Sequence, residues 1–580
     1  TQNSKLKTHR MLSLLIFIPL LTLAPIFFLS AEKSKYFKFI ALGAMGFEFI
    51  ISGLLYIKFS AAPDLLINGI ASNFKLIEKV DWISLDLGGM GKVSIDYFLG
   101  VDGLNIFMIM LSSFVLLIGV VSSWNIEKNA KGYFSLYLLL SSSIMGCFLA
   151  LDFFLFFLFF ELMLLPMYFL IGLWGGPRRE YASIKFFLYT LTGSLLILIV
   201  MIALYISVID PVETAVNLGF ITNTKIVGPG LITQVQSMLL SGDISDADKV
   251  HTFNILYMMD PGNYIPGSML HILSSSLIFG VKARYVAFLA IFIGFAIKMP
   301  SVPFHTWLPD AHVEAPTPVS VVLAALLLKV GAYGIIRIAY PVFPDGAIHY
   351  AKWVAVLGVI SIIYGAFNAL AMKDIKKLIA YSSVSHMGFV LLGIASLTVE
   401  GINGAIYQMF SHGILTTMLF LIAGVLYDRT HDRTIENYRG LASKMPNYTI
   451  VVTVAFFASL GLPGFSGFIA ELFVLLGAFH SYNLNGFIPR WLSVIAVSGI
   501  LIGAAYYLWT LQKMFFGKFW IKVPKYYGAL KDLNRREFIM LVPLIIVTTI
   551  FGLFPGLLFD LVSPAVNDLV TFMMKTNPNN

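Results

Sequence analysis

Long apolar segments, separated by short polar loops, follow one another along almost the whole chain. An apolar run of about 20 residues is the length that a helix needs to cross about 30 Å of hydrocarbon. Backbone groups inside a bilayer must be paired within the chain, so the pattern predicts an all-α polytopic membrane protein with about 14 transmembrane helices. The expected spans are 11–29, 38–58, 97–121, 133–150, 152–174, 182–208, 285–308, 317–340, 351–371, 375–398, 401–427, 449–479, 491–516 and 538–560.

Composition agrees with a chain that has the bilayer as its solvent. Hydrophobic residues make up 58% of the sequence and charged residues only 12%, against about 45–50% and about 25% in soluble proteins. The formal net charge of +8 would suit a nucleic-acid partner. The basic residues lie in short loops between apolar segments, however, as they do on the cytoplasmic side of membrane proteins. We therefore expect membrane lipids and other membrane chains as partners, and no nucleic acid.

The basic loops alternate with loops that are poor in Lys and Arg, and this alternation predicts the topology. The side that should be cytoplasmic carries Lys33, Lys35, Lys38, Lys128, Lys131, Arg178, Arg179, Lys373, Lys376, Lys377, Arg429, Arg433, Arg439, Lys444 and the segment 513–536. Both termini then face away from the cytoplasm, although the basic tail 1–10 argues against it. The long polar segment 209–284 should lie outside the membrane on the non-cytoplasmic face, with a short interfacial or packed helix at 267–280.

Two apolar helices are interrupted by proline and glycine, in IKMPSVPFHTWLP (297–309) and GLPGFSGF (461–468). Each interruption falls in the fourth helix of a five-helix unit, and an odd number of helices inverts the second unit relative to the first. Paired broken helices in inverted repeats are typical of a transport site near the membrane midplane. The expected domains are three N-terminal helices (1–121), a first repeat (133–340), a second repeat (351–517), and a C-terminal helix with its tail (538–580).

Ionisable residues inside the expected spans are the candidates for chemistry, because each costs at least about 2.5–3.5 kcal/mol at the membrane centre. Lys298 ends a half-helix whose free carbonyls favour a cation, and a nearby carboxylate would set its charge. Histidine titrates near neutrality and can pass protons on. These properties predict a proton relay of Lys, Glu and His side chains. The candidate residues are Glu161, Lys298, Lys329, His386, His412 and Glu471.

Other interpretations of these and neighbouring residues stay open. A buried carboxyl can be a neutral packing group, Lys298 can reach a headgroup, and the two histidines can be packing groups or haem ligands. Glu48 is either a packing group or functional. A second group could hold a metal, but a solvated loop mouth is the favoured interpretation; it consists of His305, Asp310, His312 and Glu314.

No cofactor is expected in this chain. The one cysteine, Cys147, lies in an apolar segment and cannot by itself form a zinc or iron–sulfur site. No phosphate-binding or dinucleotide-binding motif is present, so energy for transport would have to come from a partner chain or from a counter-gradient.

Four long motifs resemble the antiporter-like subunits of respiratory complex I (NADH:quinone oxidoreductase), and most closely the M type, called chain 4 in mitochondria. They are FFELMLLPMYFLIGLWGG, AIKMPSVPFHTWLPDAHVEAPTPVSVVLAALLLKVGAYG, LIAYSSVSHMGF and GLPGFSGFIAE. The resemblance implies that Glu161 pairs with Lys298 as a switch. It also implies that Lys329 passes protons through His386 and His412 to Glu471 at the exit. Segment 209–284 looks longer than is usual in the family, and no role is implied for it.

The resemblance also implies an environment and partners. The chain would be a translocase subunit of NADH:quinone oxidoreductase in the bacterial inner membrane, next to L-type and N-type antiporter-like subunits. It would carry no redox site itself. The alternatives are an Mrp-type Na⁺/H⁺ antiporter subunit, the equivalent subunit of a membrane-bound hydrogenase, and a membrane scaffold without a proton path.

Overall fold

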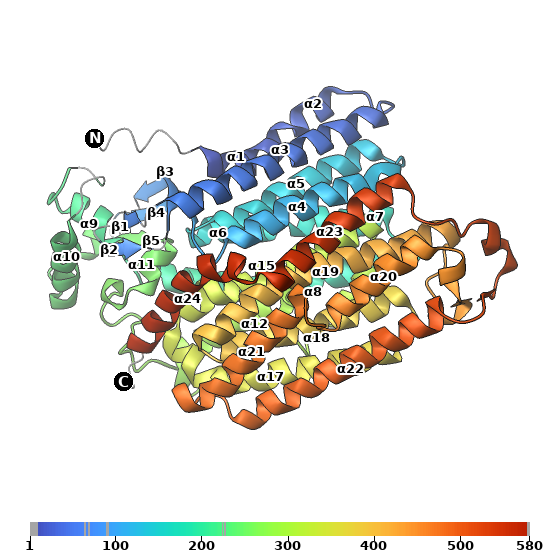
Figure 1. The fold of residues 1–580 in the computed structure, drawn as a ribbon. Coiled ribbons are helices and arrows are strands. Elements are labelled where there is room, and N and C mark those ends of the chain that lie inside the picture. Colours follow the sequence, from blue (N-terminus) through green and yellow to red (C-terminus); the bar gives the residue numbers. More distant parts are fainter. Residues whose placement is uncertain are drawn as a thin grey trace.

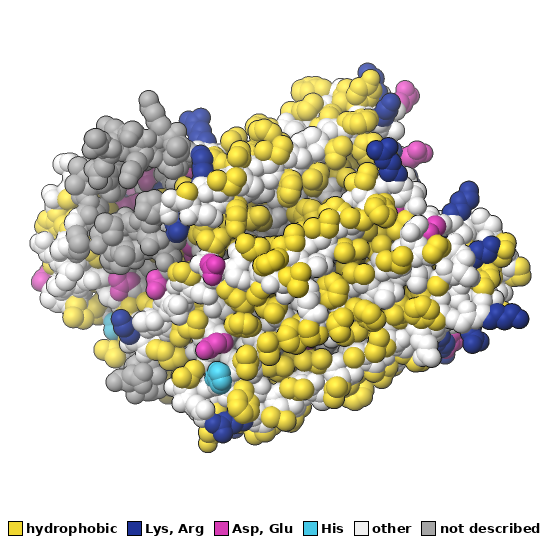
Figure 2. Space-filling model, in the orientation of Figure 1, with side chains coloured by type: hydrophobic (Ala, Val, Ile, Leu, Met, Phe, Trp, Pro, Cys, Tyr) yellow, Lys and Arg dark blue, Asp and Glu magenta, His cyan; other side chains and the backbone are white. Residues whose placement is uncertain are grey.

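The computed structural model describes residues 10–576 except 63–64, 68–69, 73, 87, 89–91, 223 and 225–227. Its helices run side by side between two ends of a bundle, and α1 begins at the end where α24 finishes (Figure 1). In this part of the chain, 14 helices are long and apolar enough to cross a membrane. Apolar side chains cover the middle of the visible face, while charged side chains gather toward both ends (Figure 2). The prediction of an all-α polytopic membrane protein is therefore confirmed.

The N-terminal region contains helices and a β-hairpin. Its helices are α1 (Met11–Leu21), α2 (Leu23–Phe28), α3 (Ser34–Ala61) and α4 (Ile106–Ser122), and its strands are β1 (Leu65–Ile67), β2 (Ile70–Ser72), β3 (Leu76–Asp86) and β4 (Lys92–Val101). The expected span 97–121 is wrong at its start, because residues 97–101 belong to β4. The segment was assigned by its apolar content alone, and the apolar strand runs almost directly into the helix. Strands β3 and β4 pair antiparallel at the end of the bundle.

The first expected repeat contains a broken helix in the predicted place. Its elements are α5 (Ala130–Leu149), α6 (Phe153–Leu162), α7 (Leu164–Trp174), α8 (Arg179–Tyr205), α12 (Ala283–Lys298), α13 (Trp307–Glu314), α14 (Thr317–Val322), α15 (Leu328–Gly334) and α16 (Tyr340–Val342). Lys298 ends α12, and the chain resumes as a helix at Trp307, whose indole nitrogen donates to Ile297 O at 3.0 Å. Two π-helical turns, Leu323–Leu327 and Ile335–Ala339, flank α15.

The second expected repeat has its break between α20 and α21. The elements from here to the C-terminus are α17 (Pro344–Ala371), α18 (Ile375–Ala395), α19 (Val399–Thr430), α20 (Pro446–Ser459), α21 (Ser466–Leu484), α22 (Arg490–Phe515), α23 (Arg535–Leu553) and α24 (Gly556–Lys575). Gly461 and Gly464 have φ values of 80° and 98° at this break, a conformation that glycine adopts without strain. The expected last span 538–560 is wrong at its end: the helix stops at Leu553, and the presumed tail is a further helix, α24.

The segment 209–284 lies at the end of the bundle opposite the basic loops, where α1 begins (Figure 1). It contains α9 (Pro211–Asn217), α10 (Pro229–Ser241), α11 (Ile255–Met259), β5 (Val250–Thr252), β6 (Leu277–Ile278) and β7 (Val281–Lys282). The helix expected at 267–280 is wrong: turns and strand β6 occupy this stretch, because its apolar residues are interrupted by serines that hydrogen-bond locally. Strand β5 pairs parallel with β4 and so joins the segment to the hairpin.

The remaining short elements lie in the loops. They are the strands β8 (Tyr438–Arg439) and β9 (Trp520–Ile521), and the 3₁₀ turns Ser123–Asn125, Asp246–Asp248, Pro261–Asn263, Ile435–Asn437, Leu441–Ser443 and Pro524–Gly528.

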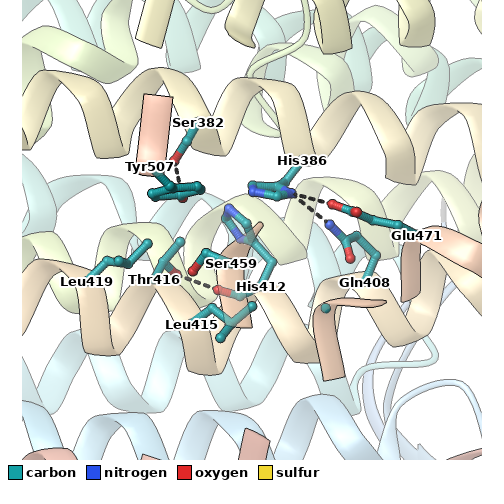
Figure 3. Close-up of a pocket in the computed structure, with 11 residues that line it drawn as sticks. Ser382, His386, Gln408, His412, Leu415, Thr416, Leu419, Ser459, Glu471 and Tyr507 are labelled. Atoms are coloured by element: carbon teal, nitrogen blue, oxygen red, sulfur yellow. Dashed lines mark hydrogen bonds and ion pairs between the residues drawn. The ribbon is translucent and has the colours of Figure 1, made fainter. Parts of the chain in front are cut away.

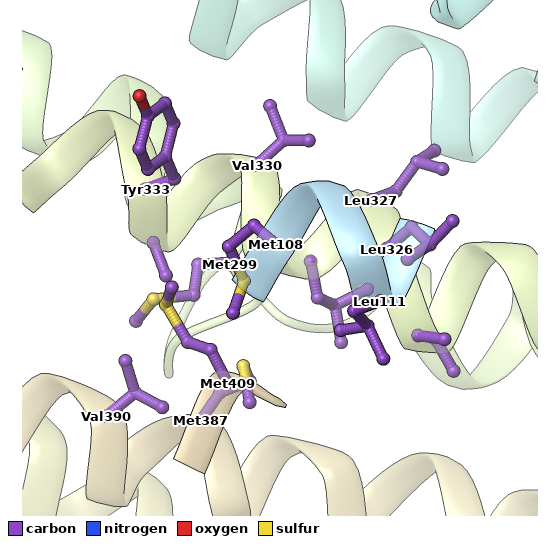
Figure 4. Close-up of a cluster of buried hydrophobic side chains, with 14 of the residues drawn as sticks. Met108, Leu111, Met299, Leu326, Leu327, Val330, Tyr333, Met387, Val390 and Met409 are labelled. Carbon is purple, nitrogen blue, oxygen red and sulfur yellow. The ribbon is translucent and has the colours of Figure 1, made fainter. Parts of the chain in front are cut away.

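Methionine-rich packing fills the centre of the bundle around α15. Met108, Met299, Met387 and Met409 come from different elements and meet near Val330 (Figure 4). Flexible thioether side chains fill irregular gaps between helices. This apolar packing lies directly beside Lys329, so the lysine sits where water screens charge poorly and electrostatic interactions are strong.

Candidate functional site

A chain of ionisable side chains begins at Lys329 in the middle of the bundle. Lys329 is completely buried (0% exposed), and its Nζ lies 2.6 Å from His412 Nδ1 and 2.6 Å from Ala324 O. Lys329 is the second residue after the first π-helical turn, and Ala324 belongs to that turn. The ammonium group therefore has a histidine nitrogen and a carbonyl as its partners and no carboxylate within ion-pair distance among the described residues.

The chain continues from α19 to α18 and then to α21. The rings of His412 and His386 are 5.5 Å apart, and His386 Nδ1 lies 3.4 Å from Glu471 Oε1. Gln408 Nε2 is 3.1 Å from the same His386 nitrogen, and Figure 3 shows Gln408 and Glu471 on one side of that ring. The nitrogen accepts from the Gln408 amide when it is unprotonated, and it donates to Glu471 when it is protonated. A protonation change at His386 thus changes its partner.

Between the two histidines the structure leaves a small cavity of about 10 Å³, lined by His386, His412, Ser459, Glu471 and Tyr507 among others (Figure 3). This is room for about one water molecule. His412 Nε2 and Gln408 Oε1 are buried at this cavity without a hydrogen-bond partner in the described chain. One water in this cavity could hydrogen-bond to both histidines.

The predicted switch residues lie on α6 and at the end of α12. Their charged groups are farther apart than the 4.0 Å of an ion pair, and neither Glu161 Oε1 nor Lys298 Nζ has a hydrogen-bond partner among the described residues. Lys298 Nζ lies 4.6 Å from the centre of the Phe160 ring. Among the titratable groups whose charge acts on Lys298, Glu161 has the largest effect. A Cβ added at Gly331 would lie 3.1 Å from Lys298 Cβ. The end of α12 therefore packs tightly against the helix that carries Lys329.

Several other buried charges in the described chain form ion pairs. Arg284 Nη2 lies 2.8 Å from Asp345 Oδ1, Arg429 Nη2 lies 2.8 Å from Glu537 Oε2, and Arg337 bonds Asp102. Breaking such a pair leaves a buried charge without compensation, which costs about 3–5 kcal/mol. Glu161, Lys298 and Lys329 have no ion-pair partner among the described residues.

The expectation of a solvated loop mouth at His305, Asp310, His312 and Glu314 is wrong. Asp310, His312 and Glu314 lie in α13, and His305 and His312 are 3% and 0% exposed. The proximity of Pro300 and Pro303 suggested an open loop, but the chain folds back into a packed half-helix. Asp310 Oδ2 binds Lys185 Nζ at 2.8 Å instead of pointing to a metal position.

His312 lies on α13, in the electrostatic field of Lys329 and of Lys376, which lines a chamber at the basic end of the bundle. Both of its ring nitrogens lack a partner in the described chain, and its ring stacks on Phe420 at 4.4 Å. The charged groups whose field acts on it are Lys376 and Lys329. The chamber has a volume of about 320 Å³ and is lined by Glu314 and Lys376 among other residues.

Sequence reasoning missed His312 and Lys376 as functional candidates. Lys376 was assigned to a basic loop, yet it is only 2% exposed and donates to Ala315 O at 3.0 Å. Its place in the helix α18, two residues after the N-cap Asp374, was the available signal. Glu48 is buried and accepts from Ser141 Oγ at 3.0 Å. Cys147 is buried, as expected.

Fourteen candidate spans, two broken helices and a buried chain of Lys, His and Glu define a class: antiporter-like transport subunits of membrane complexes. The sequence model "NADH:quinone oxidoreductase/Mrp antiporter, TM" matches residues 150–223 and 253–503. NADH-quinone oxidoreductase subunit M of Rhodobacter capsulatus is 38% identical over 97% of this chain and 96% of its own length. This chain belongs to the NADH:quinone oxidoreductase/Mrp antiporter transmembrane family.

Solved structures share the fold. A chain in the structure of respiratory complex I from Thermus thermophilus with bound NADH has a TM-score of 0.74 and 28% identity, and the match covers 97% of this chain and 99% of that one. A chain of the Mrp complex from Dietzia sp. has a TM-score of 0.72 and 19% identity, covering 97% and 98%, which shows the fold alone. The family match does not include residues 224–252, which contain α10.

Proposed function

We propose that this chain is a proton-translocating membrane-arm subunit of NADH:quinone oxidoreductase. It moves protons through Lys329, His412, His386 and Glu471, in that order, and redox chemistry elsewhere in the complex supplies the energy. The observation that carries the proposal is the contact sequence from Lys329 to His412 at 2.6 Å and from His386 to Glu471 at 3.4 Å, joined by two rings 5.5 Å apart. The 38% identity to an M-type subunit favours this function over an Mrp-type antiporter.

Protons reach Lys329 from the chamber at the basic end. Glu314 and Lys376 line that chamber. The charges of both Lys376 and Lys329 act on His312. An imidazole with both nitrogens unpartnered can accept a proton on one side and release one on the other. His312 therefore serves as the uptake step that precedes Lys329.

The Glu161–Lys298 pair controls the affinity of Lys329 for its proton. Transfer of one proton against about 180 mV costs about 4 kcal/mol. Charges at close range in an apolar core interact with energies of that size. When Glu161 approaches Lys298, the ammonium is stabilised and its positive field opposes a second charge on Lys329. In the arrangement described here the pair is apart, which favours the charge on Lys329.

Topology and assembly follow from the same proposal. The basic loops face the cytoplasm of a bacterial cell, the hairpin and segment 209–284 face the other side, and the two five-helix units are inverted repeats. Residues 1–9 and 577–580 lie outside the described chain, and we expect both termini on the non-cytoplasmic side. L-type and N-type antiporter-like subunits are the neighbours, and apolar faces such as that of α17, with Trp353 64% exposed, meet them or lipid.

Replacement of Lys329 by methionine tests the proposal. Lys329→Met keeps the shape of the apolar stem and removes the ammonium group, so we expect at least a tenfold loss of proton uptake coupled to NADH oxidation, at normal levels of assembled complex (roughly the contribution of one proton-transfer group). The matched control is Lys352→Met, at an exposed lysine of α17, which should pump normally. Normal pumping by the Lys329 variant would refute the relay.

A further inference from the structure

Acidic side chains gather where the β3–β4 hairpin meets α9 of the segment 209–284, outside the membrane-spanning helices. Asp81 and Asp96 face each other across the two strands, a pairing of like charges that destabilises a sheet. Glu213 of α9 joins them: one oxygen from each of the three carboxylates lies within 4.8 Å of the others. The completely buried Asp210 caps the N-terminus of α9 beside them.

Positive groups of the same chain balance the negative charge of these carboxylates only in part. Lys79 Nζ binds Asp96 Oδ2 at 2.7 Å and is the only cation within ion-pair distance of these carboxylates among the described residues. Asp96 is 2% exposed, and its other oxygen, Oδ1, has no hydrogen-bond partner in the described chain; the same holds for Asp210 Oδ2. Buried carboxylate oxygens without a donor are costly unless something positive binds them.

Burial also makes these carboxyl groups harder to ionise. Burial first, and then the charges of Asp210 and Asp96, raise the pKa of Glu213 to about 7. Burial likewise raises the pKa of Asp96, against the effect of Lys79. The positive charge of Lys79 offsets this effect of burial only in part.

We propose that Asp81, Asp96 and Glu213 bind a Ca²⁺ ion that fastens α9 to the hairpin. Ca²⁺ takes carboxylate oxygens at about 2.3–2.6 Å in flexible geometry, which suits three carboxylates from two strands and a helix. Mg²⁺ demands near-ideal octahedral geometry and usually keeps several waters, so it suits this set of protein ligands less well. Ser94 Oγ donates to Glu213 Oε1 at 3.0 Å and holds that carboxylate toward β4. The ion would act at the base of α6, because Asp152, the N-cap of this helix, accepts from Asp96 N at 3.3 Å.

Calcium binding to the purified complex tests the site. After treatment with a chelator, equilibrium dialysis with radioactive Ca²⁺ compares the wild type with Asp81→Asn and with the control Asp86→Asn, an exposed residue of the same strand. We expect Asp81→Asn to lose one high-affinity Ca²⁺ per complex, or at least about tenfold in affinity, since ligand charge sets Ca²⁺ affinity. Asp86→Asn should bind like the wild type.

A second readout keeps loss of folding apart from loss of the site. Terbium(III) bound beside Trp82, which is 48% exposed, should luminesce on tryptophan excitation in the wild type and not in Asp81→Asn or Glu213→Gln. Equal Ca²⁺ stoichiometry in wild type and Asp81→Asn would overturn the proposal and leave protonation as the compensating event. The proposal does not depend on the proton relay, since an actively pumping complex that binds no Ca²⁺ here refutes this site alone.

Discussion

The two broken helices of this protein place ionisable groups in opposite situations. At the first break, Lys298 is buried and Glu161 is half-buried, and neither Lys298 Nζ nor Glu161 Oε1 has a hydrogen-bond partner among the described residues. At the second break, Glu471 lies 3.4 Å from His386. In the proposed mechanism, the first break holds a separated pair that can close, and the second ends the connected path. A pump needs both, because a connected path alone would conduct protons in either direction.

The largest effect should come from Glu161→Gln. The amide keeps the volume and hydrogen-bonding capacity of Glu161 but not its charge, so Lys298 loses its counter-ion and its ammonium form becomes strongly disfavoured. We expect at least a tenfold loss of coupled proton uptake, with slower NADH oxidation by the assembled complex. Glu161→Asp keeps the charge with a shorter reach and should retain more activity than Gln. If Gln outperforms Asp, Glu161 is a packing residue.

His312 tests whether the connected path begins at the chamber. Phenylalanine preserves the stacking of this ring on Phe420, at 4.4 Å, but has no proton to pass. We expect His312→Phe to slow proton uptake by about three- to tenfold, less than Glu161→Gln, because water in the chamber can substitute in part. His349→Phe is the control, since His349 also stacks on an aromatic ring, that of Tyr285 at 4.3 Å, but outside the path. Equal rates for the two variants would place proton uptake elsewhere.

Much of the fold was predictable from apolar length, because a bilayer forces paired backbone and so leaves helices as the main choice. The same criterion failed where apolar residues lie outside the membrane. It merged the end of β4 into a helix at 97–101, and it assigned a helix to 267–280. It also missed α24, in which Asp560 and Asp568 interrupt the apolar residues.

The residues of the proposed relay could be selected from the sequence, since each is an isolated ionisable group in an apolar run; their role in proton transfer stays a prediction. Their connections could not. The expected order, His386 before His412, is wrong: Lys329 contacts His412, and His386 contacts Glu471, because the order depends on how α18 and α19 pack. The position of His312 likewise depends on the chain folding back after Pro303. These are properties of tertiary packing that local sequence does not encode.

Gly461 lies at the second break, beside Glu471, and tests how the break positions that carboxylate. Its φ of 80° is rarely adopted by other residues, and an added Cβ would lie 2.7 Å from Glu471 Oε2. We expect Gly461→Ala to destabilise the local fold by about 1–3 kcal/mol and to displace the Glu471 carboxylate. Proton pumping should fall about two- to threefold, at near-normal NADH oxidation in detergent, because the path is misaligned but its groups remain. Gly486→Ala is the control: it has a similar φ of 72° with open space around it, away from the relay.

The smallest effect should come from Glu48, which lies outside both breaks. Its carboxyl is completely buried on α3 and accepts from Ser141 Oγ at 3.0 Å. The amide of Glu48→Gln supplies the same acceptor and carries no charge, so a neutral packing group should be replaced without loss. We expect proton pumping within about twofold of the wild type, the size of change that an altered hydrogen bond of about 0.5 kcal/mol produces.

Glu48→Leu is the second variant to compare. It removes the acceptor and leaves the Ser141 hydroxyl without this hydrogen bond, so it should reduce the thermal stability of the assembled complex more than its proton pumping. If Glu48→Gln instead pumps as poorly as Glu161→Gln at normal assembly, Glu48 carries a charge during the cycle, and the proton path extends beyond the two five-helix units into the N-terminal helices.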